Sequence, residues 1–315
     1  MSFKTPIVSV VLITYNHEQF IAKAIDSVLM QNVDFEYEII IGEDLGLDNT
    51  RSICEQYASQ HSFIRVLPRN KNLGVVANWI DCVKQARGKY IMMLDGDDYW
   101  TSPQKMQLQV EFMEAHHECV ISHTDVQVLH MSTNLLSNSN KHNVPEGMIQ
   151  QDVLAGREQI TSSSMCLRTE ALVKHVPFDV FINQDFPCED WPTIAILSAF
   201  GEIRYLPIST TVYRVGQPSI TNEVNYDKIR RYWQRCKHMT ECIYALFPDL
   251  GEFKDAEYYE RYVYNALLNA AYENNDYASA REFANKNPYK RRLATICARF
   301  RLTFLLYSLY QNLKK

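Results

Sequence analysis

The sequence has few of the features that mark secreted, zinc-binding or membrane-spanning proteins. Its eight cysteines form no CxxC pair and no zinc-like spacing, so we expect reduced thiols, most of them buried. No run of about 18 apolar residues occurs, which argues against a membrane-spanning helix. The N-terminus enters a strand pattern without the apolar core of a signal peptide, and this predicts a cytoplasmic location.

Excess positive charge is also missing from most of the chain. The 315 residues include 32 Lys and Arg against 37 Asp and Glu, a formal net charge of −5. A nucleic-acid-binding domain is usually strongly basic, so we expect no nucleic-acid partner. The end of the chain differs, because eight Lys or Arg and no Asp or Glu follow from Phe283 onward.

Two familiar phosphate-binding loops, GxGxxG and GxxxxGK[ST], are absent. The sequence has instead an apolar run, residues 90–94, that ends in Asp95-Gly96-Asp97-Asp98. Carboxylates this close repel one another, and an all-oxygen cluster favours Mg²⁺ or Mn²⁺, which can hold the phosphates of a nucleotide. On these residues alone, an acidic turn with solvated side chains explains the pattern equally well.

Strand and helix patterns alternate through the first 100 residues. The predicted strands are residues 8–14, 37–41, 63–67 and 90–94, and helices begin at Glu18, 49 and 75. This order predicts an α/β fold with a mostly parallel, doubly wound sheet flanked by helices and a ligand at the carboxyl ends of its strands. Polar residues gather in the loops that follow these strands, which favours a ligand site there.

The later part of the chain first continues and then abandons this pattern. Strands are predicted at 120–129, 162–167, 204–206 and 210–213, helices at 104–116 and 192–200, and a polar loop at 132–146. Beyond residue 225 the pattern is helical, over 226–246, 256–273, 277–284 and 291–313. The change predicts two domains, residues 1–222 and 223–315.

Several short motifs stand in a characteristic order: VSVVLITYN, IIIGEDLGLDNT, NLGVVANW, YIMMLDGDDYW, ED before a helix, and VYR. With them the first 220 residues resemble a family 2 glycosyltransferase of the GT-A fold, of the type that builds bacterial cell-surface polysaccharides. The resemblance implies an inverting transfer from a nucleotide-sugar donor, with a UDP-sugar favoured, to a saccharide or lipid-linked saccharide. It also implies Mn²⁺ or Mg²⁺ as cofactor. The helical end lies outside the resemblance.

The resemblance assigns a nucleotide-binding role to the loops after the strands. Thr14, Tyr15 and Asn16 would line the nucleotide pocket. Asp44 would accept a hydrogen bond from the base, and Asn72 would belong to the same nucleotide-binding set.

The resemblance also assigns the metal site and the catalytic groups. Asp95-Gly96-Asp97 matches the DxD motif, in which Asp97 would bind the metal and Asp95 would contact the ribose or a metal-bound water. Asp190 would be the general base, with Glu189 as its neighbour. A carboxylate pair at the start of a helix is otherwise more often a helix cap.

The chain departs from the family pattern in three places, one of which is the second loop, where Glu43-Asp44-Leu45-Gly46 replaces the commoner Asp-Asp-Gly-Ser and keeps a carboxylate at both leading positions. Ala77 stands where many members have an Arg before Asn78, so Arg69 or Lys71 would have to substitute for it. Gly216 stands where many have the His of YRxH, which can complete the metal shell. These absences support one alternative, a non-catalytic nucleotide- or carbohydrate-binding protein. A sugar nucleotidyltransferase is a second, although it would usually carry a Gly-rich, basic first loop.

Two further patterns need an interpretation. Ser122, His123 and Asp125 could suggest a hydrolase triad, but side chains alternate along a strand and these three cannot converge. The helix predicted at 291–313 interleaves Leu and Phe with Arg and Lys, which suits the surface of an anionic membrane at the inner face of the plasma membrane. The alternative is packing on the helical region or on a second subunit, as in a homodimer.

Overall fold

The computed structural model describes residues 5–139, 141–216, 223–250, 256–288 and 292–314. It divides into two compact units, of which the first comprises Met1–His130, Asn134–Gln184 and Cys188–Val215. The second comprises Met131–Thr133, Asp185–Pro187 and Gly216–Lys315. The domain boundary expected at residue 222 falls outside the described residues and stays a prediction.

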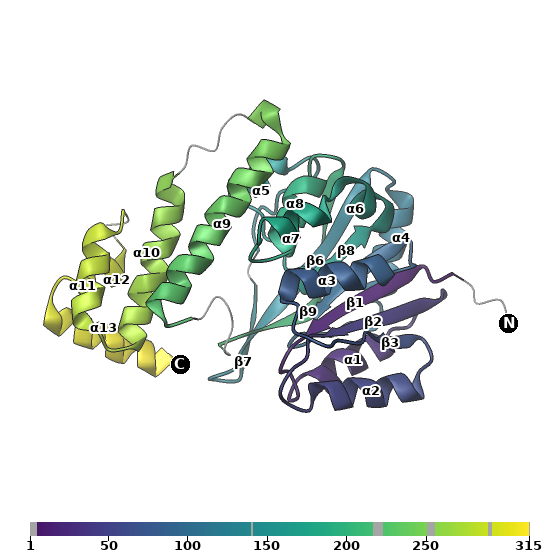
Figure 1. The fold of residues 1–315 in the computed structure, drawn as a ribbon, viewed down its shortest axis with the longest axis horizontal. Helices are drawn as coiled ribbons and strands as arrows, with labels where there is room; N and C mark the ends of the chain where they lie inside the picture. Colours follow the sequence, from purple (N-terminus) through teal and green to yellow (C-terminus); the bar gives the residue numbers. More distant parts are fainter. Residues whose placement is uncertain (1–4, 140, 217–222, 251–255, 289–291, 315) are drawn as a thin grey trace. The chain divides into compact units, whose positions relative to one another are not determined.

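The first unit is built on one sheet with the strand order β3-β2-β1-β4-β8-β6-β9-β5, and β7 pairs with β6 (Figure 1). The strands are β1 (Val8–Thr14), β2 (Tyr37–Glu43), β3 (Ile64–Val66), β4 (Tyr90–Asp95), β5 (Tyr99–Trp100), β6 (Cys119–His130), β7 (Leu135–Asn138), β8 (Met165–Arg168) and β9 (Glu202–Val215). Strands β1 to β4 are parallel, and so are β6 and β9. Strands β5, β7 and β8 pair antiparallel with their neighbours.

Helices cover both faces of the parallel strands, which is why these strands are apolar along their whole length. One face of β1 packs with α1, α2 and α4 in the main core, and α3 contacts the other face of β1 and β2. Figure 1 shows α1 and α2 on the opposite side of the sheet from α3. The helices of this unit are α1 (Ile21–Leu29), α2 (Thr50–Gln60), α3 (Val75–Gln85), α4 (Lys105–Ala115), α5 (Gln150–Leu154), α6 (Thr169–His175), α7 (Phe178–Asn183) and α8 (Asp190–Leu197). The predicted α/β fold class is confirmed.

Three local expectations were wrong in detail. The two closing strands expected at 204–206 and 210–213 are one strand, β9, because its ladder with β6 continues through a register shift near Thr124 and Asp125. The loop expected at 132–146 contains β7. The strand expected at 162–167 begins with a 3₁₀ turn, η1 (Ser162–Ser164), before β8.

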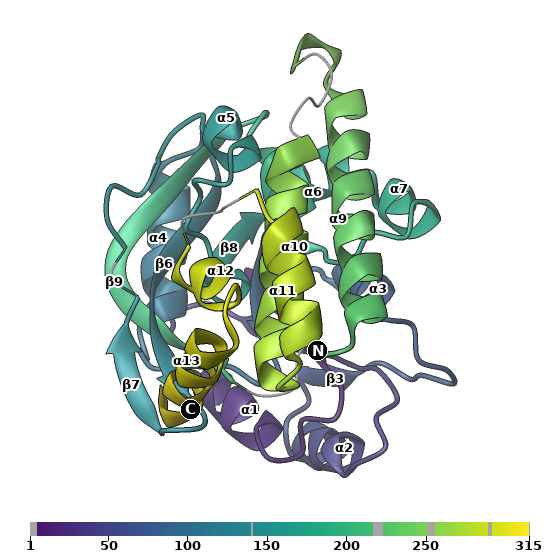
Figure 2. The ribbon, with the colours of Figure 1, turned by 90° about the vertical axis from the view of Figure 1, so that its left-hand side faces the viewer.

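The second unit is helical within its described residues, with its own core around Leu267, Leu268, Phe283 and Phe304. It contains α9 (Tyr226–Leu246), η3 (Pro248–Leu250), α10 (Ala256–Glu273), α11 (Tyr277–Lys286), α12 (Leu293–Cys297) and α13 (Arg301–Lys314). Helix α10 contacts both α9 and α11, as Figure 2 shows. The single helix expected at 291–313 is two helices, and the hydroxyl of Thr303 donates to the carbonyls of Cys297 and Phe300 where they meet.

Among the helices that the structure describes, none combines the length and the apolar character needed to traverse a bilayer.

Candidate active site

The loops that follow β1, β2 and β4 lie at one edge of the sheet. The backbone N–H of Asp44 donates to the carbonyl of Thr14 (3.0 Å), and the N–H of Gly96 donates to the carbonyl of Ile13 (2.8 Å). Ile13 also pairs with Asp95 across the ladder. The structure therefore brings together the strand ends that the sequence marked as polar.

Gly96 allows the turn after β4 to pack directly on the end of β1. A Cβ atom at this position would lie 2.4 Å from the Thr14 Oγ1 atom and 2.6 Å from its Cβ atom. The N–H of Asp98 donates to the carbonyl of Asp95 (2.9 Å) and closes the turn. Only glycine fits this close approach without a shift of the neighbouring strand.

Asp44 fixes the third loop against the second. It is buried, and its two carboxylate oxygens accept hydrogen bonds from the N–H groups of Leu73 and Gly74, at 2.8 Å each. The Asn72 side-chain amide donates to the Asp44 carbonyl (2.8 Å). Each Asp44 oxygen retains a lone pair, so the contact with a base stays a prediction beside this structural role.

The loop after β1 presents three different side chains. Thr14 is buried, with its hydroxyl 3.2 Å from the His17 Nδ1 atom. Asn16 has a positive φ of 56°, and its side-chain oxygen accepts from the N–H of Leu47 (2.7 Å), which ties the first loop to the second. Tyr15 is 44% exposed. Of the three, Tyr15 offers the largest open surface to a ligand.

Serine hydroxyls from the turn η1 hold the carboxylate of Asp95. Its Oδ2 atom accepts from the hydroxyls of Ser162 (2.6 Å) and Ser163 (3.1 Å). Burial, and next the charge of Asp97, raise the pKa of Asp95 to about 6. Asp95 is thus fixed in place but carries a destabilised negative charge.

Asp98 is fully buried directly behind Asp95. Its Oδ1 atom accepts from the N–H of Arg214 (2.9 Å), and its Oδ2 atom lies 2.8 Å from the Ser163 hydroxyl. Burial, followed by the charges of Asp95 and Asp97, raises the pKa of Asp98 well above its ordinary value. Ser163 has one hydroxyl proton for two carboxylates, so it can donate fully to Asp95 or to Asp98 but not to both at once.

Arg214 supports the same turn from β9. Its guanidinium donates to the backbone carbonyl of Asp97, and it lies over the rings of Phe20 (4.9 Å) and Tyr99 (4.7 Å). The side chain is buried apart from 7% of its surface. The Arg214 guanidinium therefore lies behind the acidic turn. There it offsets part of the negative charge and does not occupy the space where a ligand would bind.

Glu189 and Asp190 begin α8 and lie within electrostatic reach of this turn. Glu189 is 5% exposed and makes no capping hydrogen bond, whereas the Asp190 side chain accepts from the N–H of Trp191 (2.7 Å). Burial, then the charges of Asp190 and Asp95, raise the pKa of Glu189 well above its usual range. Glu158 adds to this acidic region, since burial and then Asp190 raise its pKa to about 7.

These carboxylates fit a hard divalent cation by their chemistry. Their oxygens are the ligands that Mg²⁺ and Mn²⁺ prefer, and the pKa of Asp95 is raised first by burial and then by the neighbouring charges of Asp97 and Asp190. In the described part of the chain, no three His, Cys, Asp or Glu side chains already converge as a ligand set. A cation held by fewer than three of these side chains would have positions left for water and phosphate oxygens.

Arg69 does not take the place of the missing arginine at position 77. Its guanidinium donates to the side-chain oxygen of Asn78 (2.9 and 3.2 Å) and pairs with Asp81 (2.7 Å), and the residue is 9% exposed. Lys71 is exposed on the same loop. Of the two proposed substitutes, only Lys71 is accessible to a ligand here.

The buried side chains that support the acidic turn were not predicted from the sequence. The Lys105 ammonium is fully buried and donates to the Gln109 side chain (2.5 Å) and the Ser164 carbonyl (3.0 Å), and burial lowers its pKa to about 7. The Trp100 indole donates to the Ser163 carbonyl (2.9 Å). The run of three serines was the only signal of this support in the sequence.

The hydrolase interpretation finds no support in the geometry. Ser122 accepts from the Gln109 amide (3.3 Å), Asp125 accepts from the Ser139 hydroxyl, and the buried His123 ring has no hydrogen-bond partner.

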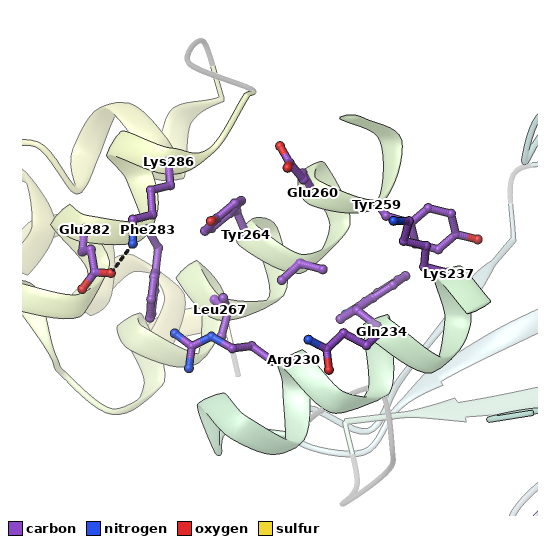
Figure 3. Close-up of a pocket in the computed structure, with 12 residues that line it drawn as sticks. Arg230, Gln234, Lys237, Tyr259, Glu260, Tyr264, Leu267, Glu282, Phe283 and Lys286 are labelled. Carbon is purple, nitrogen blue, oxygen red and sulfur yellow. Dashed lines mark hydrogen bonds and ion pairs between the residues drawn. The ribbon is translucent and has the colours of Figure 1, made fainter. Parts of the chain in front are cut away.

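A groove of about 290 Å³ lies in the helical unit, between α9, α10 and α11 (Figure 3). Each of its three cationic side chains pairs with an acid on its own helix. These pairs are Arg230 with Asp227, Lys237 with Glu241, and Lys286 with Glu282. The groove thus lacks the concentration of like charge found at the strand ends, and we assign no chemistry to it.

Solved structures define the class of the fold. A mannosyltransferase from Pyrobaculum calidifontis, in complex with GDP-Man and Mn²⁺, matches with a TM-score of 0.56 at 14% identity, over 99% of this chain and 88% of its own. Staphylococcus aureus TarS, in complex with UDP, matches with a TM-score of 0.50 at 15% identity, over 93% of this chain and 86% of that one. At these identities the likeness shows the fold, which is of the GT-A type.

The sequence then gives the family. The model for Glycosyl transferase family 2 matches residues 9–176, and the chain belongs to this family. An uncharacterized protein of Mycobacterium tuberculosis is 31% identical over 235 residues, which are 73% of this chain and 64% of the relative. The putative teichuronic acid biosynthesis glycosyltransferase TuaG of Bacillus subtilis is 33% identical over 124 residues, 39% of this chain and 48% of its own. The chain thus spans less than two thirds of these relatives.

Proposed function

We propose that this glycosyltransferase transfers a sugar, with inversion, from a nucleotide-diphosphate donor to a saccharide or lipid-linked saccharide of a bacterial surface polysaccharide. The observation that carries the proposal is the acidic turn at the end of β4, where the charges of Asp97 and Asp190 both act on the carboxylate of Asp95. The names of TuaG, which refers to teichuronic acid synthesis, and of the UDP and GDP-Man complexes support the donor and acceptor classes.

The strand-end loops would bind the nucleotide. Tyr15 would cover the base with its exposed ring, while Thr14, Asn16 and Asn72 shape the pocket. Asp44 would accept an N–H of the base through the lone pair that Leu73 and Gly74 leave open. A uracil N–H suits this contact, and a UDP-sugar remains the favoured donor.

Asp97, together with Asp95, would hold Mn²⁺ or Mg²⁺. When bound, the ion would supply the positive charge that stabilises the departing diphosphate. Asp95, which accepts hydrogen bonds from Ser162 and Ser163, would contact the ribose or a water in the ion's shell. Arg214 keeps the Asp97 backbone in position through its bond to the carbonyl.

Asp190 is the better candidate for the general base than Glu189. Glu189 is buried, which limits the access of an acceptor hydroxyl, and burial raises its pKa, which favours the protonated form over the form that accepts a proton. Asp190 is partly exposed at the start of α8. Glu189 would instead hold Asp190 in an environment of low polarity.

A donor panel tests the proposal. The full chain is incubated with Mn²⁺ and UDP-, GDP- and dTDP-sugars, and both donor hydrolysis and protection from thermal unfolding are measured. We expect one nucleotide class to give both signals. Protection without hydrolysis, even with acceptor saccharides present, would favour a non-catalytic binding protein.

Replacement of Asp190 by asparagine separates binding from chemistry. Asp190→Asn should keep donor affinity but lower donor turnover by about 100-fold or more, because an amide cannot accept the proton. The matched control is Asp179→Asn, an exposed acid in the first turn of α7, which should leave turnover unchanged. Near-normal turnover in Asp190→Asn would move the base to another residue.

A further inference from the structure

Helix α13 turns its leucines outward. Five large apolar side chains between positions 302 and 310 are 43–69% exposed: Leu302, Leu305, Leu306, Leu309 and Tyr310. Successive residues are about 100° apart around a helix, so the four leucines fall on one outward-facing stripe. A helix that only packed on its own domain would place these residues inside.

The inward side of α13 is formed by other residues. Phe304 is 1% exposed and stacks on Tyr272 with ring centroids 4.7 Å apart. The Ser308 hydroxyl donates to the Tyr272 carbonyl (3.4 Å). The helix is therefore attached to its unit without using the leucine stripe.

The segment before α13 continues the same pattern. Leu293, Ile296 and Phe300 are 59%, 44% and 66% exposed. With the five residues of α13 they make eight exposed large apolar side chains within 18 residues, and we call this set the C-terminal apolar face. Such a concentration on a protein surface usually marks an interaction site.

The charge around this face is positive. Arg292, Arg299 and Arg301 are exposed, and no acidic residue follows Glu282. The 14 residues of α13 span about 21 Å, less than the roughly 30 Å of a bilayer core, so the helix suits a position in the plane of the surface.

We propose that the C-terminal apolar face binds the surface of an anionic lipid bilayer, with the leucines among the acyl chains and the arginines at the headgroups. A second copy of the chain fits less well. A twofold interface through this face would bring two copies of the same positively charged segment together, and that segment has no acid after Glu282 to compensate the charge. The inference is independent of the proposed function, since it does not depend on donor or acceptor.

The test is co-sedimentation of the full chain with vesicles of phosphatidylcholine alone, or of phosphatidylcholine and phosphatidylglycerol in equal parts. Leu302→Ser/Leu306→Ser/Leu309→Ser should lower partition onto the anionic vesicles by about tenfold or more. The control Leu135→Ser/Leu136→Ser/Val173→Ser changes three exposed apolar residues of the first unit and should bind like the wild type. Arg299→Gln/Arg301→Gln should lower binding about 10- to 30-fold on anionic vesicles only.

Thermal unfolding and sedimentation velocity without lipid complete the test. Both triple variants should unfold within a few degrees of the wild type, because exposed positions contribute little to stability. The proposal is overturned if the wild type does not bind anionic vesicles at low salt, or if the leucine variant binds equally well. It is also overturned if the leucine variant is the only one that loses stability. A wild type that is a dimer and does not bind vesicles, together with a leucine variant that is a monomer, would overturn it as well.

Discussion

At the scale of single residues, the hydrogen bonding of the acidic turn depends on the single hydroxyl proton of Ser163. Ser163 contacts both Asp95 and Asp98 but has one hydroxyl proton to give. Burial raises the pKa of Asp98, which favours its protonated form, and we infer that Asp98 supplies the second proton. We therefore assign Asp98 a structural role, distinct from that of the half-buried Asp95 and Asp97 of the same motif.

Substitution of Asp98 tests this assignment. In Asp98→Asn the amide can donate to Ser163 while its oxygen still accepts from the N–H of Arg214, so the free energy of unfolding at pH 7 should change by less than about 1 kcal/mol. Asp98→Ala leaves both partners unsatisfied and should cost about 2–4 kcal/mol. Urea unfolding measures both. Equal, large losses in the two variants would mean that Asp98 is ionised in the folded protein.

At the scale of elements, the turn after β4 depends on close packing against β1. Gly96→Ala places a methyl group 2.4 Å from the Thr14 hydroxyl, so it should lower stability by about 1–3 kcal/mol and weaken nucleotide binding. Thr14→Ala removes the nearest atom and should recover part of the stability in the double variant. Additive effects of the two substitutions would show that the turn can move away from β1.

Prediction from sequence succeeded where a pattern is long and local. The four parallel strands were found because each is an apolar run between polar loops, and α9 was found because its period persists for 21 residues. Strand β5 has two residues and α5 five, which is too short for any period to show. Likewise β9 was divided in two because its exposed central residues interrupt the apolar pattern.

The candidate site, like the fold, could be predicted from the sequence only in part. The acidic residues could be recognised from their order along the chain. Their supports could not, because Ser162 is 67 residues from Asp95 and Arg214 is 117 residues from Asp97 in sequence. Nothing local in the sequence reveals such pairs, and the raised pKa of Asp98 depends on burial that only the folded chain creates.

At the scale of the whole molecule, the raised pKa of Asp95 predicts a pH dependence. The folded pKa of about 6 exceeds the unfolded value, so Asp95 contributes stability that is present below about pH 4 and lost as the pH rises through 6. The stability of the wild type relative to Asp95→Asn should thus fall by about 1–2 kcal/mol between pH 4.5 and 7.5 in EDTA. If this difference in stability stayed constant or rose between pH 4.5 and pH 7.5, it would contradict the raised pKa of Asp95.

The same group would couple the proposed metal binding to pH. In that proposal protons compete with Mn²⁺ for Asp95, so the increase in melting temperature on adding Mn²⁺ and a nucleoside diphosphate should shrink as the pH falls through 6. Mg²⁺ should show the same trend. An increase that is equal at pH 5 and pH 7.5 would separate the metal from this carboxylate.

The proposed function requires that the acidic turn bind a nucleotide through a divalent cation. Isothermal titration of the most protective nucleoside diphosphate into wild type and Asp97→Ala, each with Mn²⁺ and with EDTA, tests it most directly. The wild type should bind about tenfold or more tightly with Mn²⁺, and Asp97→Ala should bind with one weak affinity under both conditions. A wild-type affinity indifferent to Mn²⁺, or an Asp97→Ala variant that keeps the full Mn²⁺ effect, would contradict the account.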